Sequence, residues 1–240
     1  MGNQGEEQTR RTLRRAMLPV LAVAGIAFTC LAVIVRRWPS TRADLQVTKA
    51  FQSTEHQSVE RAMSLVSWFG FRPQSLLLPL SVVTGFWWWG RRIEAALLVV
   101  AWGSSMLSFL TKQVVRRPRP DGEVVRVVVA NIRDTSFPSG HVLHYVVFWG
   151  FVAYLLLIQA PWSGVRWFVG LVMGPVIALV GPSRIYLGHH WFTDVLGSYL
   201  LGSAYLAGLI ELHTILREFE PAESSDLPDG PAAGARQWLR

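Results

Sequence analysis

The sequence contains very little cysteine, lysine or charge for its length. One of its 240 residues is a cysteine, Cys30, which lies inside an apolar run. The chain therefore cannot contain a disulfide framework or a cysteine-based metal site. Only Lys49 and Lys112 are lysines, so nearly all of the 23 basic residues are arginines. These arginines flank apolar segments and form no separate basic domain with interleaved aromatic residues, so we expect no nucleic-acid partner.

Apolar side chains are abundant. Hydrophobic residues make up 51% of the chain and charged residues 16%, a balance typical of a protein that crosses a membrane several times. A helix needs about 20 residues to cross a hydrocarbon core of roughly 30 Å. The predicted fold is therefore all-α, a polytopic membrane protein with a six-transmembrane-helix bundle in residues 1–216. The six predicted spans lie at about residues 17–35, 73–90, 93–111, 141–159, 166–180 and 195–216.

An even number of spans predicts that both chain ends lie on the same side of the membrane. The loops after the first, third and fifth spans then lie together on the other side. The lysines and arginines of the two sides are nearly balanced outside the polar clusters, so the positive-inside rule gives only partial support for cytoplasmic termini. The tail, residues 217–240, is rich in proline, glycine, serine and acidic residues, and we expect it to be disordered.

Two polar clusters border the third and fourth predicted spans. The first is KQVVRRPRP, residues 112–120, which taken alone is typical of a basic anchor for lipid headgroups. The second is TSFPSGH, residues 135–141, which taken alone predicts a helix start with Ser139 as the N-cap. A helix N-terminus after such a turn also offers backbone N–H groups to an anion, and His141 would lie beside that anion.

The third cluster is SRIYLGHHWFTD, residues 183–194. On a helix His190 and Asp194 share a face, so the carboxylate can accept the second N–H of the imidazole and raise its basicity. An imidazole oriented in this way is a competent nucleophile towards phosphorus. Taken alone, the pair is more typical of a polar cap on the sixth helix. A metal site is a further alternative, but it would need additional ligands such as His141 and Asp134.

Together the three clusters resemble the signature of the type 2 phosphatidic acid phosphatase superfamily. That signature is Lys-x6-Arg-Pro, Pro-Ser-Gly-His and Ser-Arg-x5-His-x3-Asp, and every defined position matches between Lys112 and Asp194. The six-span hydropathy resembles the integral-membrane branch of the family over nearly the whole chain.

This resemblance implies a metal-independent lipid phosphate phosphohydrolase that needs no cofactor. His190 would attack phosphorus and form a phosphohistidine, Asp194 would orient His190, and His141 would protonate the leaving group. The residues that would bind the phosphoryl group are Lys112, Arg119, Ser139, Gly140 and Arg184.

The implied substrate is a membrane lipid phosphate, such as phosphatidic acid, phosphatidylglycerol phosphate or a polyprenyl diphosphate, whose tail stays in the bilayer. Members of the membrane branch place the site on the extracytoplasmic face of the cell membrane and both termini in the cytoplasm. A phosphotransferase that uses the same site and a non-catalytic lipid-binding or transport protein are the alternatives. Soluble acid phosphatases and vanadate-dependent haloperoxidases share the signature, but six spans argue against both. The sequence carries no indication of an oligomeric state.

Other polar residues near the clusters have simpler interpretations. We expect His144, one turn after His141, to be a core histidine with its hydrogen bonds satisfied. Four arginines could draw anionic headgroups to the site, but we favour a role in anchoring the loop. They are Arg116, Arg117, Arg126 and Arg133.

Overall fold

All regular structure in residues 2–128, 134–159 and 163–219, the part of the chain that this computed structural model describes, is helical, as the sequence predicts. Side chains are described at Pro19 and from Leu21 onward. In chain order the elements, of which η1 and η2 are π-helical, are α1 (Gly2–Arg37), α2 (Arg42–Phe51), α3 (Gln57–Trp68), α4 (Gln74–Trp88), α5 (Arg92–Trp102), α6 (Ser104–Val115), α7 (Gly140–His144), η1 (Tyr145–Trp149), α8 (Gly150–Gln159), α9 (Ser163–Phe168), η2 (Val169–Met173), α10 (Gly174–Tyr186) and α11 (Phe192–Glu218).

Four helical segments are long and apolar enough to cross a membrane. They are Arg92–Val115, Gly140–Gln159, Ser163–Tyr186 and Phe192–Glu218. The segments Leu21–Arg37 and Arg42–Phe51 pass the same test as a pair, and they are bent by 96° relative to each other. The predicted count of six spans is therefore not confirmed. Helix α4, which falls in the predicted span at 73–90, has 15 residues, whereas a crossing helix needs about 20.

Several helices extend beyond their predicted ends, towards the polar clusters. The third predicted span consists of α5 and α6, which meet at Gly103, and α6 continues to Val115. The fifth continues to Tyr186, so Arg184 lies in the last turn of α10. The sixth begins at Phe192. Hydropathy misses these turns because their charged side chains are surrounded by protein rather than by lipid.

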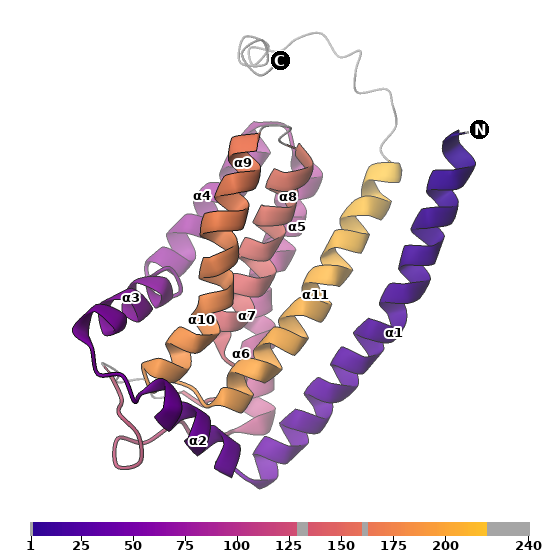
Figure 1. Ribbon diagram of the computed structural model, residues 1–240. Coiled ribbons are helices and arrows are strands. Elements are labelled where there is room, and N and C mark those ends of the chain that lie inside the picture. Colours follow the sequence, from indigo (N-terminus) through magenta and orange to yellow (C-terminus); the bar gives the residue numbers. More distant parts are fainter. Residues whose placement is uncertain (1, 129–133, 160–162, 220–240) are drawn as a thin grey trace.

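The segment Gly140–Gln159 forms the centre of the bundle. Its most apolar window is 61% buried inside the protein, whereas the windows of the other three long segments are 17% to 39% buried. A core that includes Leu98, Phe148 and Leu209 packs α5, η1 and α11 together. Close packing of this kind drives helix association inside a bilayer, where apolar surface gains little by leaving lipid. Helix α1 packs along α11 at the outside of the bundle (Figure 1).

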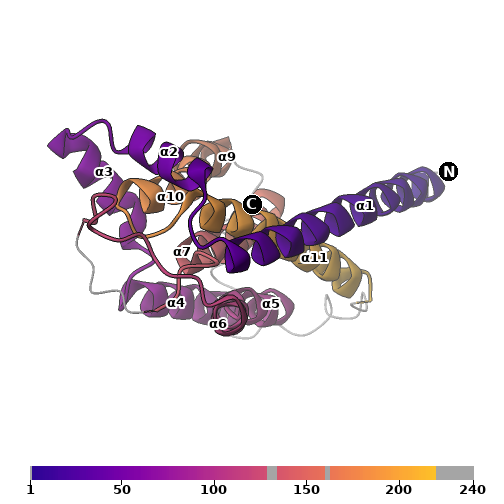
Figure 2. The ribbon, with the colours of Figure 1, turned by 90° about the horizontal axis from the view of Figure 1, so that it is seen from below.

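One end of the bundle gathers the loops that follow α1, α6 and α10. Helix α2 starts at a capping box in which Asp44 N donates to Thr41 Oγ1 at 3.1 Å and Thr41 N donates to Asp44 Oδ2 at 3.1 Å. This short helix lies across the end of the bundle and contacts α10 and α11 (Figures 1 and 2). The start of α1 and the end of α11 lie at the opposite end (Figure 1). The loops after α1, α6 and α10 therefore lie at the end of the bundle opposite to the start of α1 and the end of α11.

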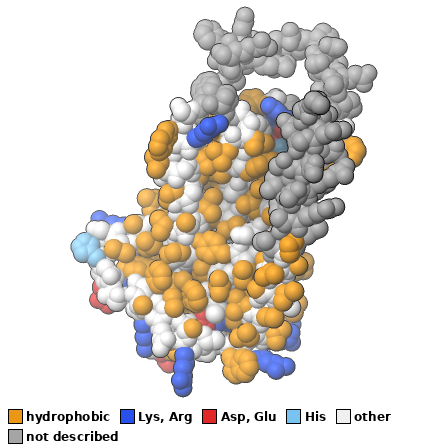
Figure 3. All heavy atoms as spheres, turned by 45° about the vertical axis from the view of Figure 1, so that its right-hand side comes forward, with side chains coloured by type: hydrophobic (Ala, Val, Ile, Leu, Met, Phe, Trp, Pro, Cys, Tyr) orange, Lys and Arg blue, Asp and Glu red, His pale blue; other side chains and the backbone are white. Residues whose placement is uncertain are grey.

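The surface agrees with a membrane location. Figure 3 shows apolar side chains over the sides of the bundle, with lysine and arginine side chains mostly near its two ends. At the end of α4, Trp88 and Trp89 are 83% and 79% exposed. Tryptophan is enriched where lipid headgroups meet the hydrocarbon core, and apolar surface this extensive is rare on a soluble monomer. These features identify a multi-pass membrane protein.

Candidate active site

The structure brings the residues predicted from the three clusters to one end of the bundle. They are Lys112 in the last turn of α6, Arg119 in the loop after it, Ser139 as the N-cap of α7, Gly140 and His141 as its first two residues, Arg184 in the last turn of α10, His190 just before α11, and Asp194 in the first turn of α11. These helix ends and the loops next to them lie at the end of the bundle where α2 packs (Figure 2).

Two backbone turns direct the chain into this end of the bundle. Helix α6 stops at Arg116, which has φ of 52° and donates its N–H to the carbonyl of Lys112 at 3.0 Å. Pro118 follows, and proline cannot continue a helix. After α10 the chain turns at Gly188, with φ of 70°. A Cβ atom there would lie 2.2 Å from the carbonyl oxygen of Arg126, so only glycine fits.

Lys112 and Arg119 converge on the carboxylate of Asp134. Both Nζ of Lys112 and the guanidinium of Arg119 contact it, and Nε of Arg119 lies 3.1 Å from Oδ1. Burial alone would raise the pKa of Asp134, but the hydrogen bond from Lys112 and the charge of Arg119 together lower it. An anionic group with two oxygen atoms thus already lies between two of the predicted phosphate-binding cations.

The imidazole of His190 lies between Arg119 and Asp194. Its Nε2 is 3.1 Å from a terminal nitrogen of Arg119, and its Nδ1 is 3.5 Å from Oδ2 of Asp194. Burial, followed by the positive charges of Arg119, Arg184 and Lys112, lowers the pKa of His190 well below 6.5. Arginine can only donate, so Nε2 accepts and the ring proton lies on Nδ1, facing the carboxylate. In this neutral tautomer the single lone pair of Nε2 points towards Arg119, and it becomes available for nucleophilic attack when that guanidinium donates to another acceptor.

The approach of Asp194 to His190 arises differently from the prediction. The two residues do not share a helix face, because His190 precedes the helix and α11 begins at Phe192. Instead, the carboxylate of Asp194 folds back over the start of α11 and accepts the N–H of Trp191 at 2.8 Å. A carboxylate in the first turn stabilises a helix N-terminus in this way. The predicted proximity is present, and the predicted helical arrangement is wrong.

A second wall of the site comes from α3 and the loop after it. The ring of Phe71 meets the ring of His141 edge to face, with centroids 4.7 Å apart, and the guanidinium of Arg184 lies 5.2 Å from the Phe71 ring centroid. Arg184 also donates to Oγ of Ser67 at 3.2 Å. A Cβ atom on Gly70 would lie 2.2 Å from Cδ2 of His141. The three clusters give no signal for this wall, since it precedes all of them in the chain.

The site contains buried polar atoms whose hydrogen-bonding capacity is unused within the described part of the chain. Buried side-chain atoms without a partner among the described residues include Oγ of Ser139, Nε2 of His141, Nε of Arg184 and Nδ1 of His190. Buried polar atoms in proteins are nearly always paired. Nδ1 of His190 faces the carboxylate of Asp194, whereas Oγ of Ser139 and Nε of Arg184 can donate to a ligand oxygen and Nε2 of His141 can exchange a proton with a ligand.

Asp194 is also held by buried residues other than His190. Its Oδ1 accepts from Arg117 at 2.5 Å, and Oδ2 accepts from the hydroxyl of Ser136. Arg117 also donates to Asp44 at 2.6 Å, and the side chains of Arg117 and both carboxylates are 0% exposed. Arg117 therefore does anchor its loop, and it does so through contacts inside the protein. Asp44 was not predicted, because its capping box with Thr41 explains it locally.

The predictions for the other polar residues near the clusters differ in outcome. The guanidinium of Arg126 does anchor its loop, because it lies 3.7 Å from the carboxylate of Glu60 and 5.0 Å from the ring centroid of Tyr186. His144 is buried as expected and stacks on Phe148 with centroids 5.4 Å apart, but neither ring nitrogen has a hydrogen-bond partner among the described residues. Arg133 and residues 220–240 of the tail lie outside the described residues.

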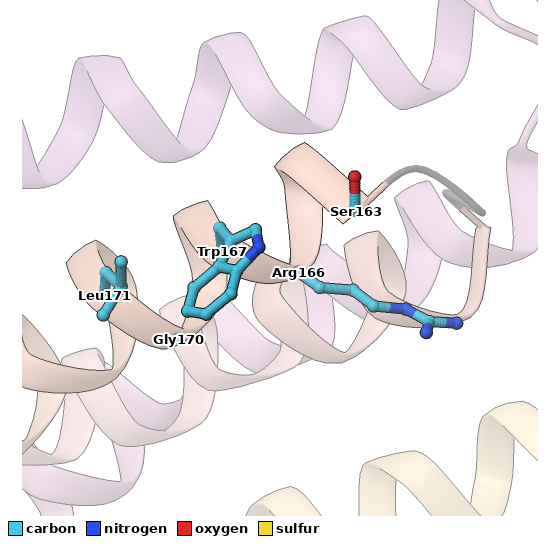
Figure 4. A pocket seen from close by; sticks show the side chains of 5 residues that line it. All are labelled: Ser163, Arg166, Trp167, Gly170 and Leu171. Carbon is cyan, nitrogen blue, oxygen red and sulfur yellow. The ribbon is translucent and has the colours of Figure 1, made fainter.

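A surface hollow elsewhere on the molecule contains none of the predicted site residues. It measures about 520 Å³ and is lined by Ser163, Arg166, Trp167, Gly170 and Leu171 (Figure 4). These residues belong to α9 and η2, at the end of the bundle opposite the clusters (Figure 1). The hollow lacks an acid–base pair. The alternative of a metal site also gains no support, since no group of three His, Cys, Asp or Glu side chains within the described ranges is placed to hold a metal ion.

The fold and the site together define a helical membrane protein with a cationic, histidine-containing centre at one end of its bundle. Residues 93–217 match the PAP2 superfamily. The chain is 30% identical over 179 residues to phosphatidylglycerophosphatase B of Bacillus subtilis (strain 168), a match that covers 73% of this chain and 85% of that protein. The protein therefore belongs to the PAP2 superfamily, and the resemblance seen in the three clusters is confirmed.

Two further comparisons agree with this assignment. The chain is 34% identical over 117 residues to undecaprenyl-diphosphatase of Sulfolobus acidocaldarius, covering 41% of this chain and 52% of that protein. Among solved structures, the transmembrane PAP2-type phosphatidylglycerolphosphate phosphatase of Bacillus subtilis is similar, with a TM-score of 0.71 and 25% sequence identity. That similarity covers 83% of this chain and 98% of the other. The helical membrane fold is thus shared with a lipid phosphatase.

Proposed function

We propose that the protein is a metal-independent lipid phosphate phosphohydrolase, which releases phosphate from a lipid whose tail remains in the bilayer. Relatives that act on phosphatidylglycerophosphate and undecaprenyl diphosphate by name support this class of substrate. The observation that carries the proposal is the position of His190, whose Nε2 lies 3.1 Å from Arg119. A phosphoryl oxygen bound to that guanidinium would bring phosphorus within reach of Nε2.

Binding in this proposal is electrostatic. Three cations take the non-bridging oxygens of the phosphoryl group, and neighbouring hydrogen-bond donors complete the clamp, which stabilises the charge of the transition state. The clamp residues are Lys112, Arg119 and Arg184, with the hydroxyl of Ser139 and the backbone N–H of Gly140. The phosphoryl group would displace the carboxylate of Asp134 from Lys112 and Arg119.

The chemical steps follow from the two histidines. Nε2 of His190 forms a bond to phosphorus as the P–O bond to the lipid breaks, and the leaving oxygen keeps the electron pair and takes a proton from His141. Asp194 accepts a hydrogen bond from Nδ1–H and stabilises the positive charge on the ring. His141 then deprotonates a water molecule, which attacks phosphorus and breaks the P–N bond. The net reaction converts a lipid monophosphate and water to a lipid alcohol and inorganic phosphate, and a lipid diphosphate and water to a lipid monophosphate and inorganic phosphate.

The location of the site at one end of the bundle suits a substrate held at a membrane surface. The phosphate would reach the site from water, while the lipid tail would stay among the apolar helices. We propose phosphatidic acid, phosphatidylglycerol phosphate and polyprenyl diphosphates as the candidate substrates. We also propose that this end faces the extracytoplasmic side and that the termini are cytoplasmic.

The proposal is tested with purified protein in detergent and a panel of these three lipids. We expect release of inorganic phosphate from at least one of them, and we expect His190→Ala to reduce kcat by at least about a thousandfold, as loss of a nucleophile does. His56→Ala is the matched control, because His56 is exposed at the start of α3, and its kcat should equal that of the wild type. Both variants should elute from a size-exclusion column at the same volume as the folded wild type.

Three results would contradict the proposal or its mechanism. Absence of phosphate release from every lipid phosphate would reject the function. A His190→Ala variant that keeps more than about a tenth of the wild-type kcat would reject the assigned nucleophile. Thin-layer analysis that finds the phosphate on a second lipid, with little free phosphate, would establish a phosphotransferase.

A further inference from the structure

We propose that Asp44 and Arg117 are positioning residues, which hold the carboxylate of Asp194 where it can align His190. The inference rests on the proposed function, because it assumes that His190 is the nucleophile. Neither residue occupies a defined position of the three clusters, and Asp44 lies outside residues 93–217, the part that matches the superfamily. The contacts of both side chains carry the argument.

The guanidinium of Arg117 is fixed by four acceptors. Its Nε donates to the carbonyl of Pro39 at 2.7 Å, and one terminal nitrogen donates to Asp44 at 2.6 Å. The other terminal nitrogen donates to Oγ1 of Thr193 at 2.6 Å and to Oδ1 of Asp194 at 2.5 Å. A planar group bound on all sides cannot rotate without breaking several bonds at once. Arg117 therefore sets the position of Oδ1 of Asp194.

Asp44 holds the start of α11 from a different helix. Its Oδ1 accepts the backbone N–H of Thr193 at 2.9 Å and the hydroxyl of Thr193 at 2.8 Å. The first N–H groups of a helix have no partner inside the helix, so Asp44 supplies an external cap immediately before Asp194. The backbone of Asp194 is thus fixed through Thr193, and its side chain is fixed through Arg117.

The charges of the group also favour a role in the reaction. One guanidinium is shared by two carboxylates, so Asp44, Arg117 and Asp194 together carry one net negative charge. That charge faces Nδ1 of His190, 3.5 Å from Asp194. If Asp44 were neutral, Arg117 would compensate Asp194 alone, and less negative charge would remain to stabilise the positive ring that forms when His190 bonds to phosphorus.

A double-mutant cycle distinguishes positioning from general support of the fold. We expect Asp44→Asn to lower kcat at least about tenfold in the wild type and less than about twofold in Asp194→Asn, because Asp44 acts through Asp194. Inhibition by inorganic phosphate should change less than about twofold, since Asp44 does not contact the phosphate-binding cations. Asp121→Asn, at an exposed loop carboxylate, is the matched control and should leave kcat unchanged.

The outcomes separate this inference from the proposed function. A wild type that hydrolyses no lipid phosphate would overturn both. An active wild type in which Asp44→Asn has full kcat, or lowers it equally in both backgrounds, would overturn only the positioning role. If Asp44→Asn does not fold, Thr193→Val replaces it in the same cycle, because it removes the hydroxyl that joins Asp44 to Arg117 and keeps both charges. We expect Thr193→Val to lower kcat at least about tenfold in the wild type and less than about twofold in Asp194→Asn.

Discussion

Asp134 illustrates how single residues balance charge in this site. Its carboxylate contacts both Lys112 and Arg119, and its side chain is 52% exposed, so it can turn towards water. Two cations held so close together repel each other unless an anion lies between them. The carboxylate supplies that anion here, and under the proposed function it would compete with the phosphoryl group for the same donors.

We predict that Asp134→Asn strengthens the binding of phosphate. Removal of the competing negative charge should lower both KM and the inhibition constant of inorganic phosphate by about fivefold, which is a modest charge effect at a half-exposed position. Asp121→Asn removes an exposed carboxylate of the same loop and should change neither constant. Steady-state kinetics in detergent measures both constants, and weaker phosphate binding in Asp134→Asn would show that the carboxylate organises the cations rather than competing for them.

The lowered pKa of His190 predicts a pH dependence of stability. His190 is buried beside Arg119, Arg184 and Lys112, so the folded state binds its proton only well below pH 6.5. The unfolded chain binds that proton near pH 6.5. As the pH falls below this value the unfolded state gains the proton first, so the free energy of unfolding decreases. When the pH is lowered from about 7 to about 5, the midpoint temperature of thermal unfolding in detergent should fall further for the wild type than for His190→Asn. Parallel curves would contradict the assigned burial of this imidazole.

The loop between α3 and α4 is the element that most directly shapes the position of His141. Gly70 lets the backbone approach the imidazole, and a Cβ atom there would lie 2.2 Å from Cδ2. We predict that Gly70→Ala lowers kcat at least about tenfold, because a displacement of about 1 Å at a catalytic group has effects of this size or larger. Gly85→Ala in α4 is the control, since a Cβ atom there meets nothing within 4 Å. Equal kcat in both variants would show that His141 tolerates displacement.

The elements show what the sequence can and cannot predict. Apolar run length located the long helices well, because lipid-facing surfaces must be apolar along their whole length. The predicted span at α4 is not confirmed, because that helix is apolar but has 15 residues. Residue spacing predicted a shared helix face for His190 and Asp194, whereas the carboxylate of Asp194 instead folds back over the start of α11. Spacing within the three clusters identified the cations and histidines that the fold brings together. It could not reveal that Asp44 and Arg117 pair, because they are 73 residues apart and each has an ordinary local explanation.

The whole molecule places its clusters at one end and the start of α1 and end of α11 at the other (Figure 1). Together with the proposed extracytoplasmic orientation of the site, this arrangement predicts the result of a labelling experiment on intact cells. Cys30 is the single cysteine, so Cys30→Ser gives a cysteine-free background. We predict that Asp121→Cys, in the loop after α6, reacts with a membrane-impermeant maleimide from outside. Ser163→Cys, at the start of α9 at the opposite end, should react only after permeabilisation. The reverse pattern would place the site on the cytoplasmic side.

The contact between α2 and the start of α11 limits how parts of this protein can be exchanged with those of its relatives. Asp44 contributes a buried carboxylate from a helix that precedes residues 93–217, the region that matches the superfamily. A chimera that takes this region from a relative and keeps the native first 92 residues would therefore bring together two halves of a charge network that evolved separately. Recombination between family members should succeed where residues 44 and 117 come from the same parent, and grafts that separate them should leave an uncompensated charge beside Asp194 at the start of α11.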